Sequence, residues 1–272
     1  MERGLVIAID GPAAGGKGTV ARRLAQRLGY RFVDTGAMYR AVAWAALRKG
    51  LSLDDGEALG ELATHLEMDF QERVTPEGVF YRLLVNGQDV TEAIRQPEVE
   101  RASSVVAQYP QVRRVLVAKQ RQLARQGGVV MEGRDITTVV LPDADLKLYI
   151  TASLTERAQR RYAQYQEQGY MTPGPPHEHL ATLQAQLMLR DQRDAQRATS
   201  PLRIAQDAIV LDTTCLSVEE SVEVIWRLLR TRFPHALPRS TPDAQNVHVQ
   251  PTLEESSPGE VKSSSLGGIG RG

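Results

Sequence analysis

The sequence has little of what marks secreted, disulfide-bonded or membrane-spanning proteins. Its 272 residues contain one cysteine, Cys215, which excludes an internal disulfide framework and favours a reducing compartment. The apolar run at residues 5–9 is too short for a signal peptide, and no run approaches the length of a membrane span. We therefore expect a soluble protein of the cytoplasm.

The sequence also lacks an excess of charge of either sign. It contains 33 basic and 33 acidic residues, so its formal net charge at neutral pH is zero. Proteins that bind nucleic acid or membrane surfaces through electrostatics usually carry a basic excess, so we expect neither kind of partner. Histidine is scarce, and the five histidines show no spacing typical of a metal site.

A glycine-rich segment near the start of the chain lies between an apolar run and a helical pattern. The run at 5–9 is typical of a buried strand, and Val20, Leu24 and Leu28 recur at helical spacing. In a strand–loop–helix context, glycines let backbone N–H groups converge on phosphate oxygens, and the helix N-terminus adds partial positive charge. The predicted ATP-binding loop consists of Gly11, Pro12, Ala13, Ala14, Gly15, Gly16, Lys17, Gly18 and Thr19.

Within this loop, Lys17 is predicted to reach the terminal phosphates as a mobile charge. Position 18 is glycine, so the hydroxyl expected after the lysine comes one residue later, at Thr19. This Gly-Lys-Gly-Thr variant resembles the nucleoside monophosphate kinases, which transfer a phosphoryl group between two nucleotides.

Strand-like and helical segments alternate along most of the chain. Further core strands are predicted at 30–33, 129–131, 146–150 and 208–211. They indicate an α/β protein with the three-layer P-loop NTPase fold and a five-stranded parallel sheet. The predicted organisation is a kinase core at 1–65 and 95–232 with a helical lid at about 154–197, a small antiparallel β insert at 66–94, and a disordered tail at 236–272.

Polar side chains follow the second predicted strand. Ligands of doubly wound sheets lie beyond the carboxyl ends of the strands, so we expect Asp34, Thr35, Tyr39 and Arg40 to face the same crevice as the P-loop. Taken alone, the same residues would also fit a turn that caps an ordinary helix.

Arginines are concentrated in the predicted lid and at strand ends. Arg190 and Asp194 are four residues apart, which predicts a salt bridge along the helix, and a capping box is predicted at Ser153–Glu156. Phosphoryl transfer between two nucleotides requires cations that neutralise several phosphate charges. The residues predicted to act in catalysis are Lys17, Arg134, Arg190, Arg193 and Arg197.

Together these motifs resemble the bacterial cytidylate kinases over about residues 4–232. The segments that carry the resemblance are the P-loop, 34–40, Pro110 with 112–113, 132–135, and 190–191 with Asp194 and Arg197. The resemblance implies transfer of the γ-phosphoryl group of ATP to CMP or dCMP. It also implies Mg²⁺ as cofactor, with Thr19 as its protein ligand, and a monomeric enzyme.

The resemblance further implies individual roles. Ser104, Arg113 and Asp135 would surround the cytosine, and Arg157 would contact ATP. Two positions depart from the family pattern near the expected CMP phosphate: Glu132 stands where aspartate is usual, and Thr137 stands where glycine is common. The implied CMP-binding residues are Asp34, Thr35, Tyr39, Arg40, Ser104, Arg113, Arg134, Asp135, Arg190 and Asp194.

The implied base site agrees with the chemistry of cytosine. An arginine can donate to the acceptors O2 and N3, and a carboxylate can accept from the exocyclic amine. Uracil carries a carbonyl in place of that amine, so UMP is predicted to be a poor substrate. Two alternatives remain open: a kinase of the same fold that acts on shikimate, gluconate or AMP, and a non-catalytic P-loop switch or scaffold whose tail recruits a partner.

Overall fold

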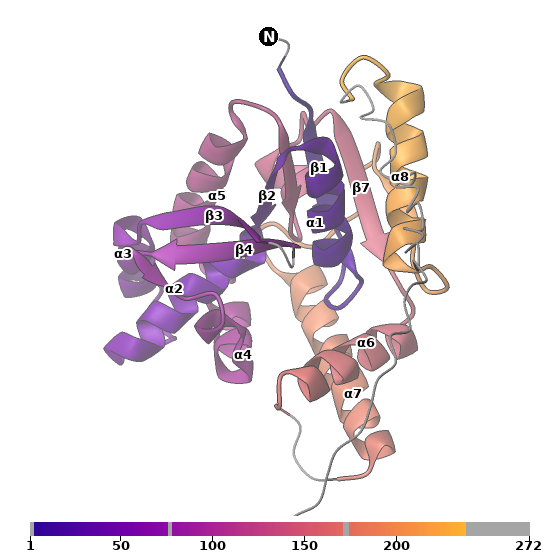
Figure 1. Ribbon diagram of the computed structural model, residues 1–272. Helices are drawn as coiled ribbons and strands as arrows, with labels where there is room; N and C mark the ends of the chain where they lie inside the picture. The colour runs from indigo at the N-terminus through magenta and orange to yellow at the C-terminus, as the bar shows by residue number, and fades with distance from the viewer. Residues whose placement is uncertain (1–2, 76–77, 171–173, 238–272) are drawn as a thin grey trace, which may run out of the picture. The chain divides into compact units, whose positions relative to one another are not determined.

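A five-stranded parallel sheet forms the centre of the protein in the computed structural model, which describes residues 3–75, 78–170 and 174–237 (Figure 1). The strand order is β2-β6-β1-β7-β8, so β1 lies between two neighbours that come much later in the chain. This arrangement confirms the predicted α/β class and parallel sheet. The strands are β1 (Val6–Asp10), β2 (Arg31–Asp34), β6 (Val129–Glu132), β7 (Leu146–Thr151) and β8 (Ile209–Asp212).

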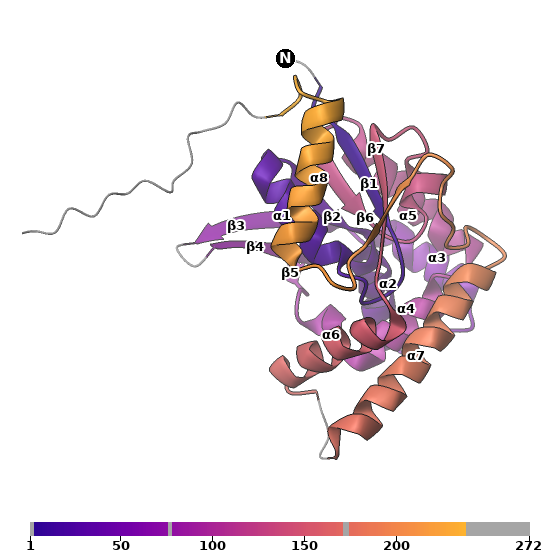
Figure 2. The ribbon, with the colours of Figure 1, turned by 90° about the vertical axis from the view of Figure 1, so that its right-hand side faces the viewer.

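Helices cover both faces of this sheet (Figure 2). Ile7 and Ile9 of β1 pack with α1 (Lys17–Leu28) and α8 (Val218–Arg232) on one face. Val6 and Ala8 face the opposite side, where α5 (Pro110–Ala124) and a short turn of π-helix (Ile136–Val140) lie. Because β1 is buried on both faces, each of its residues up to the final aspartate is apolar. The predicted three-layer arrangement is confirmed.

Residues 35–124 join helices to a small antiparallel sheet. We call this part the acceptor side, because several residues predicted to bind the acceptor nucleotide fall within it. The helices α2 (Thr35–Lys49), α3 (Gly56–His65) and α4 (Pro97–Val106) pack with α5 around one apolar cluster. The predicted insert is present as β3 (Met68–Thr75), β4 (Gly78–Val85) and β5 (Gln88–Asp89), with the first strand longer than expected. The turn predicted at 75–78 includes two residues, 76 and 77, that lie outside the described residues.

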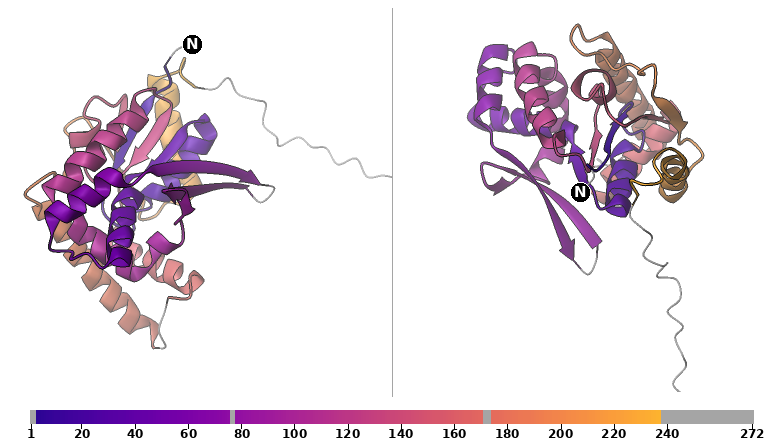
Figure 3. Two further views of the ribbon diagram at one scale, coloured as in Figure 1. Left: turned by 90° about the vertical axis from the view of Figure 1, so that its left-hand side faces the viewer. Right: turned by 90° about the horizontal axis from the view of Figure 1, so that it is seen from above.

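The β3–β4 hairpin extends away from the helices that precede and follow it (Figure 3). It contacts strand β2 of the parallel sheet through an aromatic side chain. The ring of Tyr81 meets that of Phe32 edge-to-face, with centroids 5.1 Å apart. The guanidinium of Arg22 on α1 lies 5.5 Å from the Phe32 ring centre and 5.6 Å from that of Tyr81. These contacts attach the insert to the core beside the P-loop helix.

The predicted lid consists of two helices, α6 (Leu154–Glu167) and α7 (Pro176–Gln196). They pack on each other and against the P-loop through Ala13, Ala158, Leu183 and Leu187. Within the described part of the chain, no helix is both long enough and apolar enough to span a membrane. The predicted tail lies outside the described residues from 238 onward.

Only one of the two hydrogen bonds of the capping box predicted at the start of α6 is formed. The Ser153 hydroxyl accepts from the Glu156 N–H at 3.2 Å, as expected. The Ser153 N–H, however, donates to the Thr214 hydroxyl at 2.9 Å, and the Glu156 carboxylate pairs with Arg160 at 2.8 Å. The bond from the Ser153 N–H to the Glu156 side chain is therefore replaced, on one side by the distant Thr214 and on the other by Arg160 of the next helical turn. The corresponding box at the start of α8 is complete.

Candidate active site

The P-loop wraps its backbone around the buried ammonium of Lys17. Gly11 has φ +149°, and any Cβ there would collide with the Ile150 carbonyl oxygen, so only glycine fits. Gly16 has φ +85° and lies immediately before α1. Lys17 is the first residue of the helix and is 5% exposed, and its Nζ donates to the Pro12 carbonyl at 2.8 Å. The loop therefore presents backbone N–H groups and one cation to the space in front of it.

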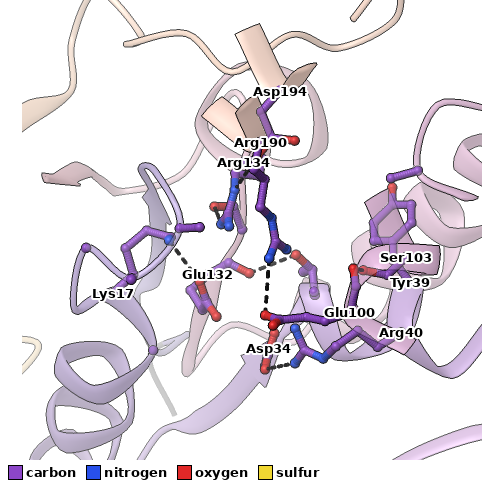
Figure 4. Close-up of a pocket in the computed structure, with 18 of the residues that line it drawn as sticks. Lys17, Asp34, Tyr39, Arg40, Glu100, Ser103, Glu132, Arg134, Arg190 and Asp194 are labelled. Atoms are coloured by element: carbon purple, nitrogen blue, oxygen red, sulfur yellow. Dashed lines mark hydrogen bonds and ion pairs between the residues drawn. The ribbon is translucent and has the colours of Figure 1, made fainter. Parts of the chain in front are cut away.

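A carboxylate from the neighbouring strand faces that cation. The Nζ of Lys17 lies 3.8 Å from the Glu132 carboxylate (Figure 4). Burial, together with the charge of Arg134, lowers the pKa of Lys17. Burial and the nearby charge of Asp34 raise the pKa of Glu132. The charged form of each group therefore depends on an opposite charge nearby. A bound phosphate can replace Glu132 as the counter-ion of Lys17.

A single cleft brings together most of the residues predicted from sequence. It is bounded by the P-loop, the carboxyl ends of β2 and β6, helices α4 and α5, and the lid. It is lined by Ala13, Ala14, Gly15, Gly16, Lys17, Gly18, Thr19, Asp34, Thr35, Tyr39, Arg40, Ser104, Arg113, Arg134, Asp135, Arg190, Asp194 and Arg197.

Four predicted residues do not line the cleft. Gly11 and Pro12 form the buried base of the P-loop. Arg157 is buried behind it, where its guanidinium donates to the Ala13 carbonyl at 3.3 Å and to the Asp191 carboxylate at 2.7 Å. Arg157 therefore supports the loop backbone in this structure. Arg193, which was predicted to act in catalysis, is exposed on α7 and outside the cleft.

At the end of β2, an acidic side chain holds an arginine of the next helix. Asp34 accepts from the Ala37 N–H at 2.9 Å, which caps α2, and from Arg40 at 2.7 Å. Although burial opposes it, these partners lower the pKa of Asp34. The Thr35 hydroxyl donates to the Glu132 carbonyl at 2.8 Å, which joins β2 to β6. Arg40 is thus fixed at the cleft wall with donors left for a phosphate.

A third ion pair lies on the wall of the cleft formed by α5 and the segment after β6. The guanidinium of Arg113 donates to the carboxylate of Asp135, and the two residues are 3% and 4% exposed. The Tyr39 ring lies 5.6 Å from the Arg113 guanidinium, and burial raises the pKa of the Tyr39 phenol to about 12. Ser104 is half-buried on the same wall. The group offers donors and acceptors in a desolvated environment, which suits the polar edge of a base.

The salt bridge predicted between Arg190 and Asp194 is not formed. The carboxylate of Asp194 instead accepts from Arg134 at 2.9 Å and from Arg197 at 2.9 Å. Arg190 donates to Glu100 of α4 at 3.1 Å (Figure 4). The helical spacing was favourable, but two other guanidinium groups occupy Asp194 and a carboxylate from a distant helix reaches Arg190.

Asp10 is a buried residue of the site that the sequence analysis did not identify. Its carboxylate, at the end of β1, accepts from the Ile136 N–H at 2.9 Å and the Thr137 N–H at 2.8 Å. The Thr137 hydroxyl adds a third bond at 2.6 Å. Burial raises the pKa of Asp10, although these bonds oppose the rise. Thr137, which was expected near the CMP phosphate, therefore lies buried behind the P-loop and does not line the cleft.

Glu100 is the second residue that was missed, and its side chain lies inside the cleft. In sequence it stands in the first turn of a helix, where an acidic residue is favoured by the helix dipole alone. No local pattern distinguishes it from Glu98, its exposed neighbour in the same turn. Its partners are on the lid and become visible only in the folded chain.

Comparison with known proteins identifies the family of this chain. A family model described as cytidylate kinase matches residues 7–231. A cytidylate kinase of Desulfitobacterium hafniense is 48% identical over 240 residues, which are 88% of this chain and 99% of that protein. A cytidylate kinase of a Geobacillus species is 46% identical over 233 residues, 86% of this chain and 100% of that one.

A bifunctional pantoate ligase/cytidylate kinase of a Synechococcus species is 49% identical over 230 residues. The match covers 84% of this chain and 41% of that longer protein. The resemblance found in the motifs is thus confirmed across the folded core. With a family match over most of its length and relatives that align from end to end, this chain belongs to the cytidylate kinase family.

Proposed function

We propose that this protein transfers the γ-phosphoryl group of ATP to CMP or dCMP. The observation that carries the proposal is one cleft lined both by the P-loop with Lys17 and by the buried pair of Arg113 and Asp135. The first is suited to the phosphates of ATP and the second to the base of an acceptor nucleotide. The names of the relatives support the same acceptor.

Cytosine would be read by the paired side chains. Arg113 has five N–H donors and its pairing with Asp135 leaves some of them for O2 and N3 of the base. Asp135 keeps acceptor positions for the exocyclic amine. UMP would place a carbonyl against that carboxylate, which explains why we expect it to be a poorer substrate.

Phosphoryl transfer would then depend on position and charge. An ionised oxygen of the CMP phosphate attacks the γ-phosphorus, a new P–O bond forms, and the bond to the β–γ bridging oxygen breaks to release ADP. No general base is required because the attacking oxygen is already ionised near neutral pH. We assign Arg40 and Arg134 to the acceptor phosphate and Lys17 to the transferring group, because all three line the cleft.

Magnesium is proposed to accompany ATP, with Thr19 as its protein ligand. Among the described residues, no cluster of three or more His, Cys, Asp or Glu side chains could form a metal cage. Mg²⁺ commonly takes one or two protein ligands and completes its shell with phosphates and water, so the exposed Thr19 hydroxyl on the cleft wall fits this mode. When bound, the ion would neutralise charge on the β- and γ-phosphates.

The lid arginines are proposed to act during closure over both nucleotides. Arg190 and Arg197 already line the cleft, whereas the exposed Arg193 would require movement of α7 to contact a phosphate. We further propose that the enzyme works as a cytoplasmic monomer, in keeping with its balanced charge and its complete cleft within one chain.

The deciding experiment is an acceptor comparison. ADP formation from ATP and Mg²⁺ is measured with CMP, dCMP, UMP, AMP and shikimate offered side by side. Turnover concentrated on CMP and dCMP is the expected result. A preference for AMP or shikimate would overturn the assigned base site, and a lack of turnover with every acceptor would overturn the proposed activity.

A further inference from the structure

Glu100 connects the acceptor side of the cleft to the lid. One carboxylate oxygen accepts from Arg161 of α6 at 2.8 Å and from Arg190 of α7 at 3.1 Å. The other accepts from the Tyr165 hydroxyl of α6 at 3.2 Å. The Glu100 side chain is 14% exposed and projects from α4 among the arginines of the cleft (Figure 4).

These bonds connect the acceptor side to the lid, whose apolar side chains belong to separate clusters. In the described ranges of the chain, every side-chain hydrogen bond and ion pair between residues 35–124 and the lid at 154–197 ends on Glu100. The apolar contacts of the lid helices are instead made with each other and with Ala13 and Ala14 of the P-loop. One carboxylate thus joins the acceptor side to the lid.

The charge of Glu100 is set by its surroundings. Burial alone would raise its pKa, but Arg161, Arg190 and Arg40 together lower it to about 2. The group is therefore ionised throughout the physiological range. It neutralises arginines that line the same cleft as the P-loop. The same arginines are suited to bind a phosphate group when a nucleotide occupies the cleft.

We propose that Glu100 is a positioning residue whose carboxylate substitutes for the acceptor phosphate in the nucleotide-free enzyme. It holds Arg161 and Arg190 over the cleft and also faces Arg40, which we assign to the acceptor phosphate, so it competes with the phosphate of CMP for this group of cations. This inference rests on the proposed function, because CMP is taken as the acceptor. The contact keeps the lid arginines in place before substrate arrives and lowers the affinity for CMP in return.

The test replaces the charge while keeping the shape. In E100Q, KM for CMP should fall about three- to tenfold, the range expected when one partly buried competing ion is neutralised. KM for ATP should stay unchanged, and so should both constants in E98Q, the matched control from the same helical turn. A merely structural role would raise KM for CMP, so an unchanged or higher value in E100Q overturns the proposal.

Hydrogen exchange of the free enzyme provides a second readout. Without nucleotide, amides of α6 and α7 should exchange faster in E100Q than in wild type or E98Q, and saturating CMP with ADP should remove the difference. Because this measurement needs no turnover, it separates the two proposals: unchanged exchange overturns the role of Glu100 even if CMP is phosphorylated. If E100Q does not fold, Y165F, which removes one bond to Glu100, should show the same changes at smaller size, and wild-type behaviour would overturn the proposal.

Discussion

Arg113 of α5 and Asp135 of the loop after β6 form a buried ion pair on the wall of the cleft. The two residues come from different layers of the fold and are each less than one-twentieth exposed. Loss of one partner of such a pair leaves an uncompensated buried charge and destabilises the fold. Both side chains are therefore needed for stability as well as being suited to recognition of a base.

Replacement of Asp135 by Asn should relax base selection. The amide can donate to the uracil carbonyl, so the ratio of kcat/KM for CMP over UMP should fall about tenfold or more. Because Arg113 loses its counter-charge, the free energy of unfolding should also decrease, by about 3 kcal/mol. Both effects are measured by steady-state kinetics with each nucleotide and by urea unfolding. D143N, at an exposed aspartate eight residues further on, should change neither, and an unaltered CMP preference in D135N would contradict the assigned base site.

Replacement of Lys17 by Ala should abolish transfer but leave CMP binding intact. Lys17 is the buried cation of the P-loop, and its loss removes charge stabilisation from the transferring group, so kcat should fall by about a thousandfold. Arg113 and Asp135 are untouched, so calorimetric titration should still detect CMP. K49A, an exposed lysine in the last turn of α2, serves as control. Retained turnover in K17A would contradict the assignment.

Two adjacent threonines allow a matched test of the support behind the P-loop. The Thr137 hydroxyl donates to the buried carboxylate of Asp10, whereas the Thr138 hydroxyl has no hydrogen-bond partner among the described residues. T137V should therefore lower the free energy of unfolding by about 1–3 kcal/mol and weaken ATP binding. T137S keeps the hydroxyl and loses only a methyl group, so it should be more stable than T137V, and T138V should be neutral. Equal effects of T137V and T138V in urea unfolding would contradict this explanation.

Acid should weaken the protein partly through Glu100. Its carboxylate faces Arg40 of α2, Arg161 and Tyr165 of α6, and Arg190 of α7, and its folded-state pKa is about 2. A pKa lowered by folding stabilises the folded state above the unfolded value and is lost as the pH falls through the folded one. Between about pH 6 and about pH 3 this contribution should decrease by about 2 kcal/mol.

The measurement is the free energy of unfolding across that range in wild type, E100Q and E98Q. Wild type and E98Q should lose stability more steeply than E100Q, whose amide does not titrate. Parallel curves for wild type and E100Q would show that Glu100 is not ionised by its lid partners.

Local sequence patterns predicted most of the fold. The sequences of helices α3 and α4 explain why these two elements are harder to predict. Helix α3, which contains two glycines, was not predicted; any Cβ at Gly60 would lie 2.6 Å from the Cβ of Gln111 on α5. That glycine allows two helices to approach closely. Helix α4 carries serines and β-branched valines of low helix propensity, and it is stabilised by burial of Val99, Ala102 and Val106 in the core of the acceptor side.

Sequence alone determined the P-loop and the parallel sheet, because these depend on short-range features: glycine conformation, strand hydrophobicity and helical spacing. The residues proposed to surround the base were implied by the resemblance to the cytidylate kinases and stay a prediction. Only the tertiary structure decided which charges pair. Arg190 was expected to bind Asp194 four residues away, but it meets Glu100, 90 residues earlier. Charge pairing depends on which side chains converge across the cleft, and sequence spacing carries that information only within one helix.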